Sequence, residues 1–249
     1  MSNVQFHEMA DGRTIAFRHT DGDGPTLVFL PGYMSDMDGG KATALFEDAK
    51  AKGRACLLLD YSGCGQSSGD FADGTLSRWR EEVIALVKAC ISGPVLLVGS
   101  SMGGWLMLLV AEELREDPVH PLAGIIGIAP APDFTTWGYS DEQRAIMAGG
   151  ETVYEDNPYG PEPTPTHPGF FADAQDQVML GGPIALDVPV RLLHGREDAD
   201  VPYEISVALA EALDTPDVQL TLVWDGDHRL SRDGDIALLK RTAASFYES

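Results

Sequence analysis

Residues 95–115 constrain the fold of this chain more than any other segment. Residues 95–98 are a continuous apolar run, and residues 101–115 have the composition of a largely buried helix. Between them stands Gly99-Ser100-Ser101-Met102-Gly103. A short, wholly apolar run is typical of a strand buried on both faces of a parallel sheet. A strand that turns directly into a helix therefore predicts helices layered on a parallel sheet.

The rest of the chain repeats this alternation. Further strands are predicted at residues 14–18, 26–30, 56–59, 125–128, 188–193 and 218–224, and helices at 41–52, 75–91, 202–213 and 233–247. The turn residues of 21–25 predict a hairpin or meander between the first two strands. We expect one α/β domain over residues 1–249, with a mostly parallel central sheet flanked by helices.

The alternation stops between about residues 133 and 186, after the sixth strand. Prolines and glycines are frequent there, and the segment is too long for an ordinary connection. It also contains seven aromatic residues: Phe134, Trp137, Tyr139, Tyr154, Tyr159, Phe170 and Phe171. A solvated linker would not carry so many, so the segment is predicted to be a lid inserted into the domain. Trp137 and Phe170 are its candidate substrate-binding residues.

Composition limits the partners and the compartment. The net charge is −22, from 39 acidic and 17 basic residues, which disfavours binding to nucleic acid or to an anionic membrane surface. No apolar run is long enough to span a bilayer, and residues 1–8 do not resemble a signal peptide or an organellar presequence. Three widely spaced cysteines do not suggest disulfides or a metal site. The expectation is a soluble, cytoplasmic protein; its oligomeric state is not indicated.

The G-x-S-x-G pattern around Ser101 indicates a serine nucleophile. In a strand–turn–helix context this pattern exposes the serine hydroxyl on a sharp turn, and the helix N-terminus favours developing negative charge. Ser100 is the alternative nucleophile, but it lacks glycines at the right offsets.

A serine hydroxyl needs a base, and the base needs a carboxylate to orient it. Of six histidines, His228 follows the last strand and preserves the chain order serine, acid, histidine. His194 is interpreted as a structural residue at a strand end. The acid is predicted to be Asp198, in a loop that also contains Glu197 and Asp200. Asp200 is expected to cap the following helix, and Asp227 to be a solvated loop carboxylate.

Two backbone amides are needed to stabilise an oxyanion. The amide of Met102 follows the nucleophile directly. Tyr33 is the second candidate, because Gly32 allows the preceding loop to turn its amide inward. No histidine or carboxylate spacing indicates a metal site, and no cofactor is expected.

These motifs together resemble the α/β-hydrolase superfamily over nearly the whole chain. The segment 60–67, the His194-Gly195 pair with Asp198, and the Asp227-His228 pair match its typical loops. Within the superfamily the chain is most similar to the mitochondrial palmitoyl-protein thioesterase and acyl-glucuronide esterase subgroup, in segments 31–33, 60–63, 99–107 and 191–195. The lid matches poorly, and a presequence has no counterpart here.

The expected activity is hydrolysis of a small-molecule carboxylic ester or thioester through an acyl-enzyme on Ser101. The same residues also serve hydrolysis of amides, lactones and carbon–carbon bonds, and perhydrolysis. A non-catalytic ligand-binding protein on this fold is the alternative from another class.

Overall fold

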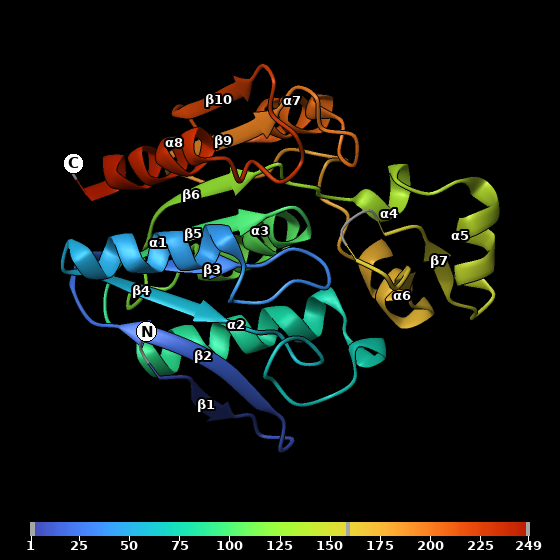
Figure 1. Ribbon diagram of the computed structural model, residues 1–249, viewed down its shortest axis with the longest axis horizontal. Helices are drawn as coiled ribbons and strands as arrows, with labels where there is room; N and C mark the ends of the chain where they lie inside the picture. Colours follow the sequence, from blue (N-terminus) through green and yellow to red (C-terminus); the bar gives the residue numbers. More distant parts are fainter. Residues whose placement is uncertain (1–2, 158–159, 248–249) are drawn as a thin grey trace.

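The centre of the molecule is a twisted eight-stranded sheet (Figure 1). The computed structural model describes residues 3–157 and 160–247. The strand order is β1-β2-β4-β3-β5-β6-β9-β10, in which the β1–β2 and β2–β4 pairs are antiparallel and the others parallel. The strands are β1 (Gln5–Glu8), β2 (Thr14–Thr20), β3 (Asp23–Leu30), β4 (Arg54–Leu59), β5 (Val95–Ser100), β6 (Leu122–Ile128), β9 (Val190–Gly195) and β10 (Val218–Val223). The predicted α/β architecture is confirmed.

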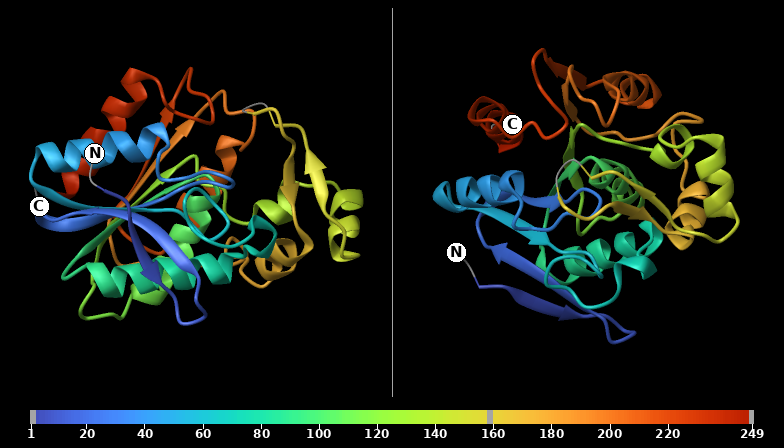
Figure 2. Two further views of the ribbon diagram at one scale, coloured as in Figure 1. Left: turned by 60° about the horizontal axis from the view of Figure 1, so that its bottom comes forward. Right: turned by 45° about the vertical axis from the view of Figure 1, so that its right-hand side comes forward.

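Helices cover both faces of the sheet, as the right-hand view of Figure 2 shows. On one face lie α1 (Gly40–Ala51) and α8 (Asp233–Ala244), and on the other α2 (Leu76–Cys90), α3 (Met102–Leu114) and α7 (Tyr203–Ala212). Short 3-10 turns occur at Phe71–Asp73 and Ser245–Tyr247. Each face of the sheet has its own apolar core, which explains why residues 27–30, 56–59 and 95–98 of the central strands are continuously apolar.

The expected hairpin between the first two long strands is wrong. The strand β2 pairs with β4 and not with β3, because β3 lies on the far side of β4. The connection crosses the start of β4 at Gly22, where a Cβ would lie 2.2 Å from the carbonyl carbon of Arg54. A turn sequence fixes where a chain bends, but this close backbone crossing depends on the order of the sheet.

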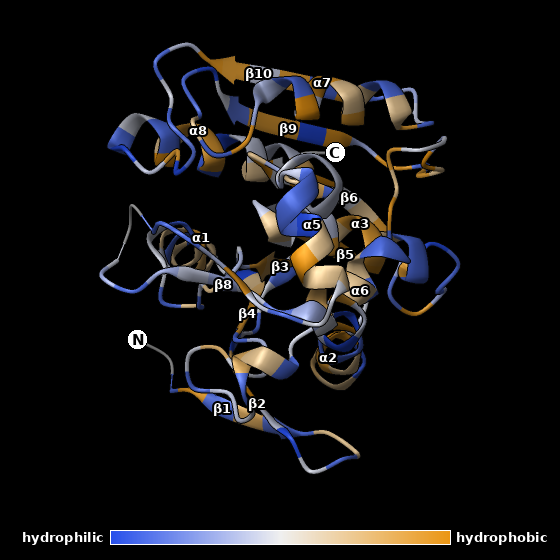
Figure 3. Ribbon diagram, turned by 90° about the vertical axis from the view of Figure 1, so that its right-hand side faces the viewer, coloured by the Kyte–Doolittle hydropathy of each residue, from blue (hydrophilic) through white to orange (hydrophobic). Residues whose placement is uncertain are grey.

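In its described residues, 133–157 and 160–186, the inserted segment lies beyond the carboxyl ends of the parallel strands (Figure 1). It contains α4 (Phe134–Trp137), α5 (Asp141–Ala148), β7 (Val153–Glu155), β8 (Thr164–Thr166) and α6 (Pro168–Gln175). Seen from that end, α5 and α6 lie in front of β5 and α3 (Figure 3). Tyr159 lies outside the described residues. None of the described helices is long and apolar enough to cross a membrane.

Buried polar contacts fasten the insertion to the sheet. Asp133, buried at its start, accepts hydrogen bonds from the amides of Met179 and Leu180 near its end, at 2.9 and 2.7 Å. The indole of Trp105 in α3 donates to the carbonyl of Gln177 at 3.0 Å. Both ends of the insertion are therefore held against the same region of the domain.

Candidate active site

The turn between β5 and α3 holds Ser101 in a strained conformation. Its φ is +56°, in the region that side-chain-bearing residues rarely adopt. The neighbouring glycines are required by close backbone packing. A Cβ on Gly99 would lie 2.3 Å from the carbonyl oxygen of Gly103, and one on Gly103 would lie 2.2 Å from that of Leu30. The surrounding backbone thus fixes the serine at the end of the central strand.

The structure brings Ser101, His228 and Asp198 together from three distant parts of the chain. Nε2 of His228 lies 3.1 Å from Oγ of Ser101, and Nδ1 lies 2.8 Å from Oδ2 of Asp198. The loops carrying the acid and the histidine pack backbone to backbone, since a Cβ on Gly195 would lie 2.3 Å from the carbonyl oxygen of Gly226. This is the arrangement in which an imidazole can take a proton from a serine hydroxyl.

Asp198 is held as a charged carboxylate by its surroundings. Its side chain is fully buried, and its Oδ1 accepts hydrogen bonds from the amides of Asp200 and Val201 at 2.9 and 2.8 Å. Burial acts to raise the pKa of Asp198, but hydrogen bonds from His194 and His228 outweigh it and leave this pKa well below its usual range. An ionised carboxylate at this position can stabilise an imidazolium during reaction.

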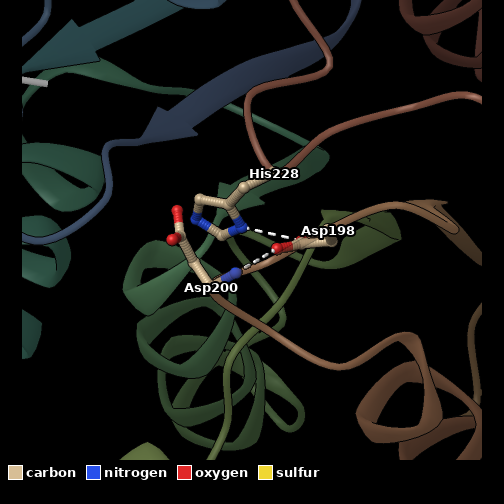
Figure 4. Close-up of side chains that lie close together, drawn as sticks. All are labelled: Asp198, Asp200 and His228. Carbon is tan, nitrogen blue, oxygen red and sulfur yellow. Dashed lines mark hydrogen bonds and ion pairs between the residues drawn. The ribbon is translucent and has the colours of Figure 1, made fainter. Parts of the chain in front are cut away.

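Asp200 does not cap the following helix, so that expectation is wrong. The helix α7 begins only at Tyr203, and its first turn has no side-chain cap. The carboxylate of Asp200 instead lies beside the ring of His228 (Figure 4). Asp227 is exposed, as expected, and also accepts a hydrogen bond from the amide of Leu230 at 3.0 Å.

Among the residues that the structure describes, Asp198, Asp200 and His228 form a group with the chemistry to bind a metal ion. One ligand atom from each lies within 4.8 Å of the others (Figure 4). Both oxygens of Asp198, however, already accept hydrogen bonds from imidazole and backbone donors. We therefore interpret this carboxylate as a partner of the histidine.

The loop after β3 passes directly beside the nucleophile. A Cβ on Gly32 would lie 3.3 Å from the Cβ of Ser101, and the hydroxyl of Tyr61 donates to the carbonyl of Pro31 at 3.0 Å. Among the backbone hydrogen bonds of the described turns, loops and helix ends, none has the amide of Tyr33 or Met102 as its donor. The two amides predicted for an oxyanion hole thus lie in segments that flank Ser101.

A cavity of about 420 Å³ opens over Ser101 and His228. Its other walls come from the loop after β3, the start of α1, and the insertion, which contributes Asn157 and Thr164. Tyr33 lines the cavity, whereas Trp137 and Phe170 are not among its lining residues. Phe170 is buried in an aromatic cluster with Tyr33, Trp79 and Phe134.

Trp137 occupies a different position from the one expected. It is half-buried, and its indole donates to the carbonyl of Pro132 at 2.9 Å. This hydrogen bond joins two residues at the start of the insertion that are five positions apart.

Sequence reasoning missed Lys41, which lines the cavity at the start of α1. Its ammonium donates to the carbonyl of Arg229, the residue after the site histidine. Burial, with a smaller effect from the charge of Arg229, lowers the pKa of Lys41 to about 8, against the opposing effect of nearby carboxylates. A lysine after two glycines has no signal in the sequence, because its neighbour at Arg229 is 188 residues away.

The model of the alpha/beta hydrolase family matches residues 27–247. The chain belongs to that family. It is 36% identical over 243 residues to the mouse protein named palmitoyl-protein thioesterase ABHD10, mitochondrial. The match covers 96% of this chain and 80% of the relative. The human protein of the same name is 33% identical over 97% of this chain and 79% of its own length.

Two solved structures agree closely with this one. A hydrolase from Agrobacterium vitis S4 has a TM-score of 0.91 and 38% identity, over 98% of this chain and 99% of the other. Mouse alpha/beta hydrolase domain-containing protein 10 has a TM-score of 0.90 and 34% identity, over 99% of each chain. Together the relatives support hydrolysis of esters or thioesters by this chain.

One expectation is overturned by these relatives. The sequence predicted a cytoplasmic location, but the curated relatives carry a mitochondrial location in their names. The absence of a recognisable presequence was weak ground for a compartment, because the targeting segment of a chain is independent of its fold.

Proposed function

We propose that this chain is a serine hydrolase that cleaves a carboxylic ester or thioester through an acyl-enzyme on Ser101. The observation that carries the proposal is the contact of Ser101 Oγ with His228 Nε2 at 3.1 Å, while Nδ1 of the same ring contacts Asp198 at 2.8 Å. The alpha/beta hydrolase family match and the thioesterase names of the relatives support the same reaction class.

In the first half of the reaction, the hydroxyl oxygen of Ser101 attacks the acyl carbonyl carbon, and Nε2 of His228 accepts the hydroxyl proton. The negatively charged Asp198 keeps the hydrogen of the ring on Nδ1 and stabilises the imidazolium that forms. The imidazolium then returns its proton to the leaving alcohol or thiol. An acyl ester on Ser101 remains.

In the second half, a water molecule attacks the acyl carbonyl carbon and His228 again accepts the proton. The bond between this carbon and Oγ of Ser101 then breaks, His228 returns the proton to Ser101, and the carboxylic acid is released. The tetrahedral intermediates of both halves carry an oxyanion, for which we assign the amides of Tyr33 and Met102 as donors. Donors of this kind each contribute about 3–4 kcal/mol to transition-state stabilisation. No metal or cofactor enters this sequence of steps.

We further propose that the insertion over residues 133–186 acts as a lid within a single domain. Asn157 and Thr164 in the cavity wall support this, because the insertion and the domain enclose the site jointly. A lid of this kind excludes water and shapes the substrate pocket. The substrate is a small acyl ester or thioester, and the strongly acidic net charge disfavours a nucleic acid or an anionic membrane as partner.

The test is labelling with a fluorophosphonate, followed by peptide mapping and by assays of ester and thioester hydrolysis. We expect the label on Ser101, and Ser101→Ala should lower kcat by about 10⁴-fold or more. Ser100→Ala is the matched control and should retain most activity. An unlabelled, inactive wild-type protein that binds acyl ligands would instead identify a non-catalytic receptor. A label on Ser100 would reassign the nucleophile.

A further inference from the structure

A second histidine, His194, contacts the acid of the site at the same carboxylate oxygen as His228. It is the fifth residue of β9 and is fully buried. Its Nε2 lies 3.1 Å from Oδ2 of Asp198 and 3.0 Å from the carbonyl oxygen of Val201. Its Nδ1 lies 2.7 Å from the hydroxyl of Ser206, which is also fully buried, in α7.

These contacts determine where the ring carries its hydrogen. The carbonyl of Val201 and the carboxylate of Asp198 only accept hydrogen bonds, so Nε2 of His194 carries the hydrogen. It donates to the carbonyl of Val201, and the same nitrogen lies 3.1 Å from Oδ2 of Asp198. The hydroxyl of Ser206 can then donate to Nδ1 of His194 and fix that tautomer. The tautomer matters because, in its other form, the ring would present a lone pair to a negatively charged oxygen.

We propose that His194 is a positioning residue that holds Oδ2 of Asp198 in line with His228. This inference rests on the proposed triad. Oδ1 of Asp198 is held by two backbone amides, whereas Oδ2 is held by the two imidazoles. Of these donors, the ring of His228 changes its charge during the proposed reaction. His194 is the side-chain donor that stays fixed while it does so.

The structure offers a matched control in His120. This histidine is also buried, and its ring nitrogens contact Asp117 at 3.1 Å and the carbonyl of Ile91 at 3.2 Å. It lies in the loop before β6, at the amino ends of the parallel strands and so at the edge of the sheet away from Ser101. Replacing it therefore removes a buried, doubly bonded histidine without touching the site.

The first measurement compares kcat and KM for an ester in His194→Leu, His194→Gln and His120→Leu. We expect kcat to fall by about 10- to 100-fold in His194→Leu with little change in KM, the scale of a small displacement of a catalytic group. Glutamine places an N–H near the position of Nε2 and should restore part of the loss. His120→Leu should lose stability but keep its kcat.

The decisive measurement repeats His194→Leu in an Asp198→Ala background. If His194 acts through Asp198, the second substitution has no further effect on kcat once the carboxylate is gone. An equal fold-loss in both backgrounds would overturn the inference, since it would show an independent structural effect. If His194→Leu does not fold, the same cycle decides the question by the same criterion with His194→Gln, which keeps an N–H donor, and with Ser206→Ala, which keeps the imidazole and removes only its partner at Nδ1.

The two proposals fail in distinguishable ways. Full activity in Ser101→Ala or Asp198→Ala would refute the triad itself. Loss of activity in both of those variants, together with independent effects of His194→Leu and Asp198→Ala, would leave the triad standing and remove only the role of His194.

Discussion

The ring of Tyr33, in the wall of the cavity over Ser101, packs against the ring of Phe170 in α6 with centroids 5.0 Å apart. The hydroxyl of Tyr33 also donates to the carbonyl of Pro165 in β8 at 3.0 Å. The loop that is proposed to supply an oxyanion donor is thus packed directly against the insertion. A substitution in the aromatic cluster of the insertion should therefore shift Tyr33 and alter the cavity over Ser101.

Shortening Phe170 should therefore alter the preference for acyl length, although this residue does not line the cavity. Phe170→Leu leaves space behind Tyr33 and should raise kcat/KM for octanoyl relative to acetyl esters, by the equivalent of about 1–3 kcal/mol. Leucine is chosen because alanine at a buried phenylalanine costs about 3–5 kcal/mol of stability. Trp137→Leu is the control and should leave the ratio unchanged. If the octanoyl-to-acetyl ratio of kcat/KM in Phe170→Leu equals the wild-type ratio, the aromatic cluster only stabilises the fold.

Asp198 and Asp200 should differ sharply when each is changed to asparagine. Asp198→Asn retains the shape of the side chain but removes the charge beside His228, and kcat should fall by about 10²- to 10⁴-fold. Asp200 is exposed, so water screens its charge, and Asp200→Asn should change kcat by less than about tenfold. Steady-state kinetics on a p-nitrophenyl ester measures both. A normally folded but inactive Asp200→Asn enzyme would move the role to Asp200.

The lowered pKa of Lys41 makes a prediction about stability and pH. Burial is its main cause and brings the pKa to about 8, whereas an unfolded chain holds this proton to roughly pH 10.4. Between these values the unfolded state binds more protons, so the wild-type protein gains stability as the pH rises. Lys41→Met lacks this gain.

The free energy of unfolding of Lys41→Met relative to wild type should accordingly fall by about 1–3 kcal/mol between about pH 7 and pH 10. Urea unfolding at several pH values measures it. The lost hydrogen bond to the carbonyl of Arg229 shifts the difference equally at each pH. A difference that does not vary with pH would show that the ammonium is well solvated in the folded state.

Gly103 should not accept even the smallest side chain. A Cβ there would lie 2.2 Å from the carbonyl oxygen of Leu30 and 2.3 Å from that of Pro31. Gly103→Ala must push the loop after β3 away from α3, so we expect a loss of stability of about 1–3 kcal/mol together with a loss of kcat. Gly234→Ala in α8 is the matched control, since nothing lies within 4 Å of its added Cβ.

The control variant should gain up to about 1 kcal/mol, because alanine favours a helix more than glycine does. Thermal unfolding and ester kinetics of the two variants test the pair. Equal behaviour of Gly103→Ala and Gly234→Ala would show that the loop after β3 adapts freely.

Local pattern alone predicted most of the central sheet. Continuous apolar runs predicted the positions of β4 and β5, because the part of a strand that is covered on both faces has few polar positions. The residues Ser101, Asp198 and His228 were also predicted from the sequence, since each stands just after a strand. In a parallel sheet those positions share one edge. Their proximity follows from strand direction and does not depend on the details of packing.

Tertiary structure alone decided the features that depend on contacts between distant segments. The order of β2, β4 and β3 reflects the close crossing at Gly22, which no turn sequence reveals. Lys41 joins the cavity, and Phe170 leaves its wall, because of how α1 and the insertion pack onto the domain. The spacing of apolar residues in the sequence indicates which face of a helix or strand is buried. Which other element packs against that face depends on contacts between segments that are distant in the chain, and only the tertiary structure determines these contacts.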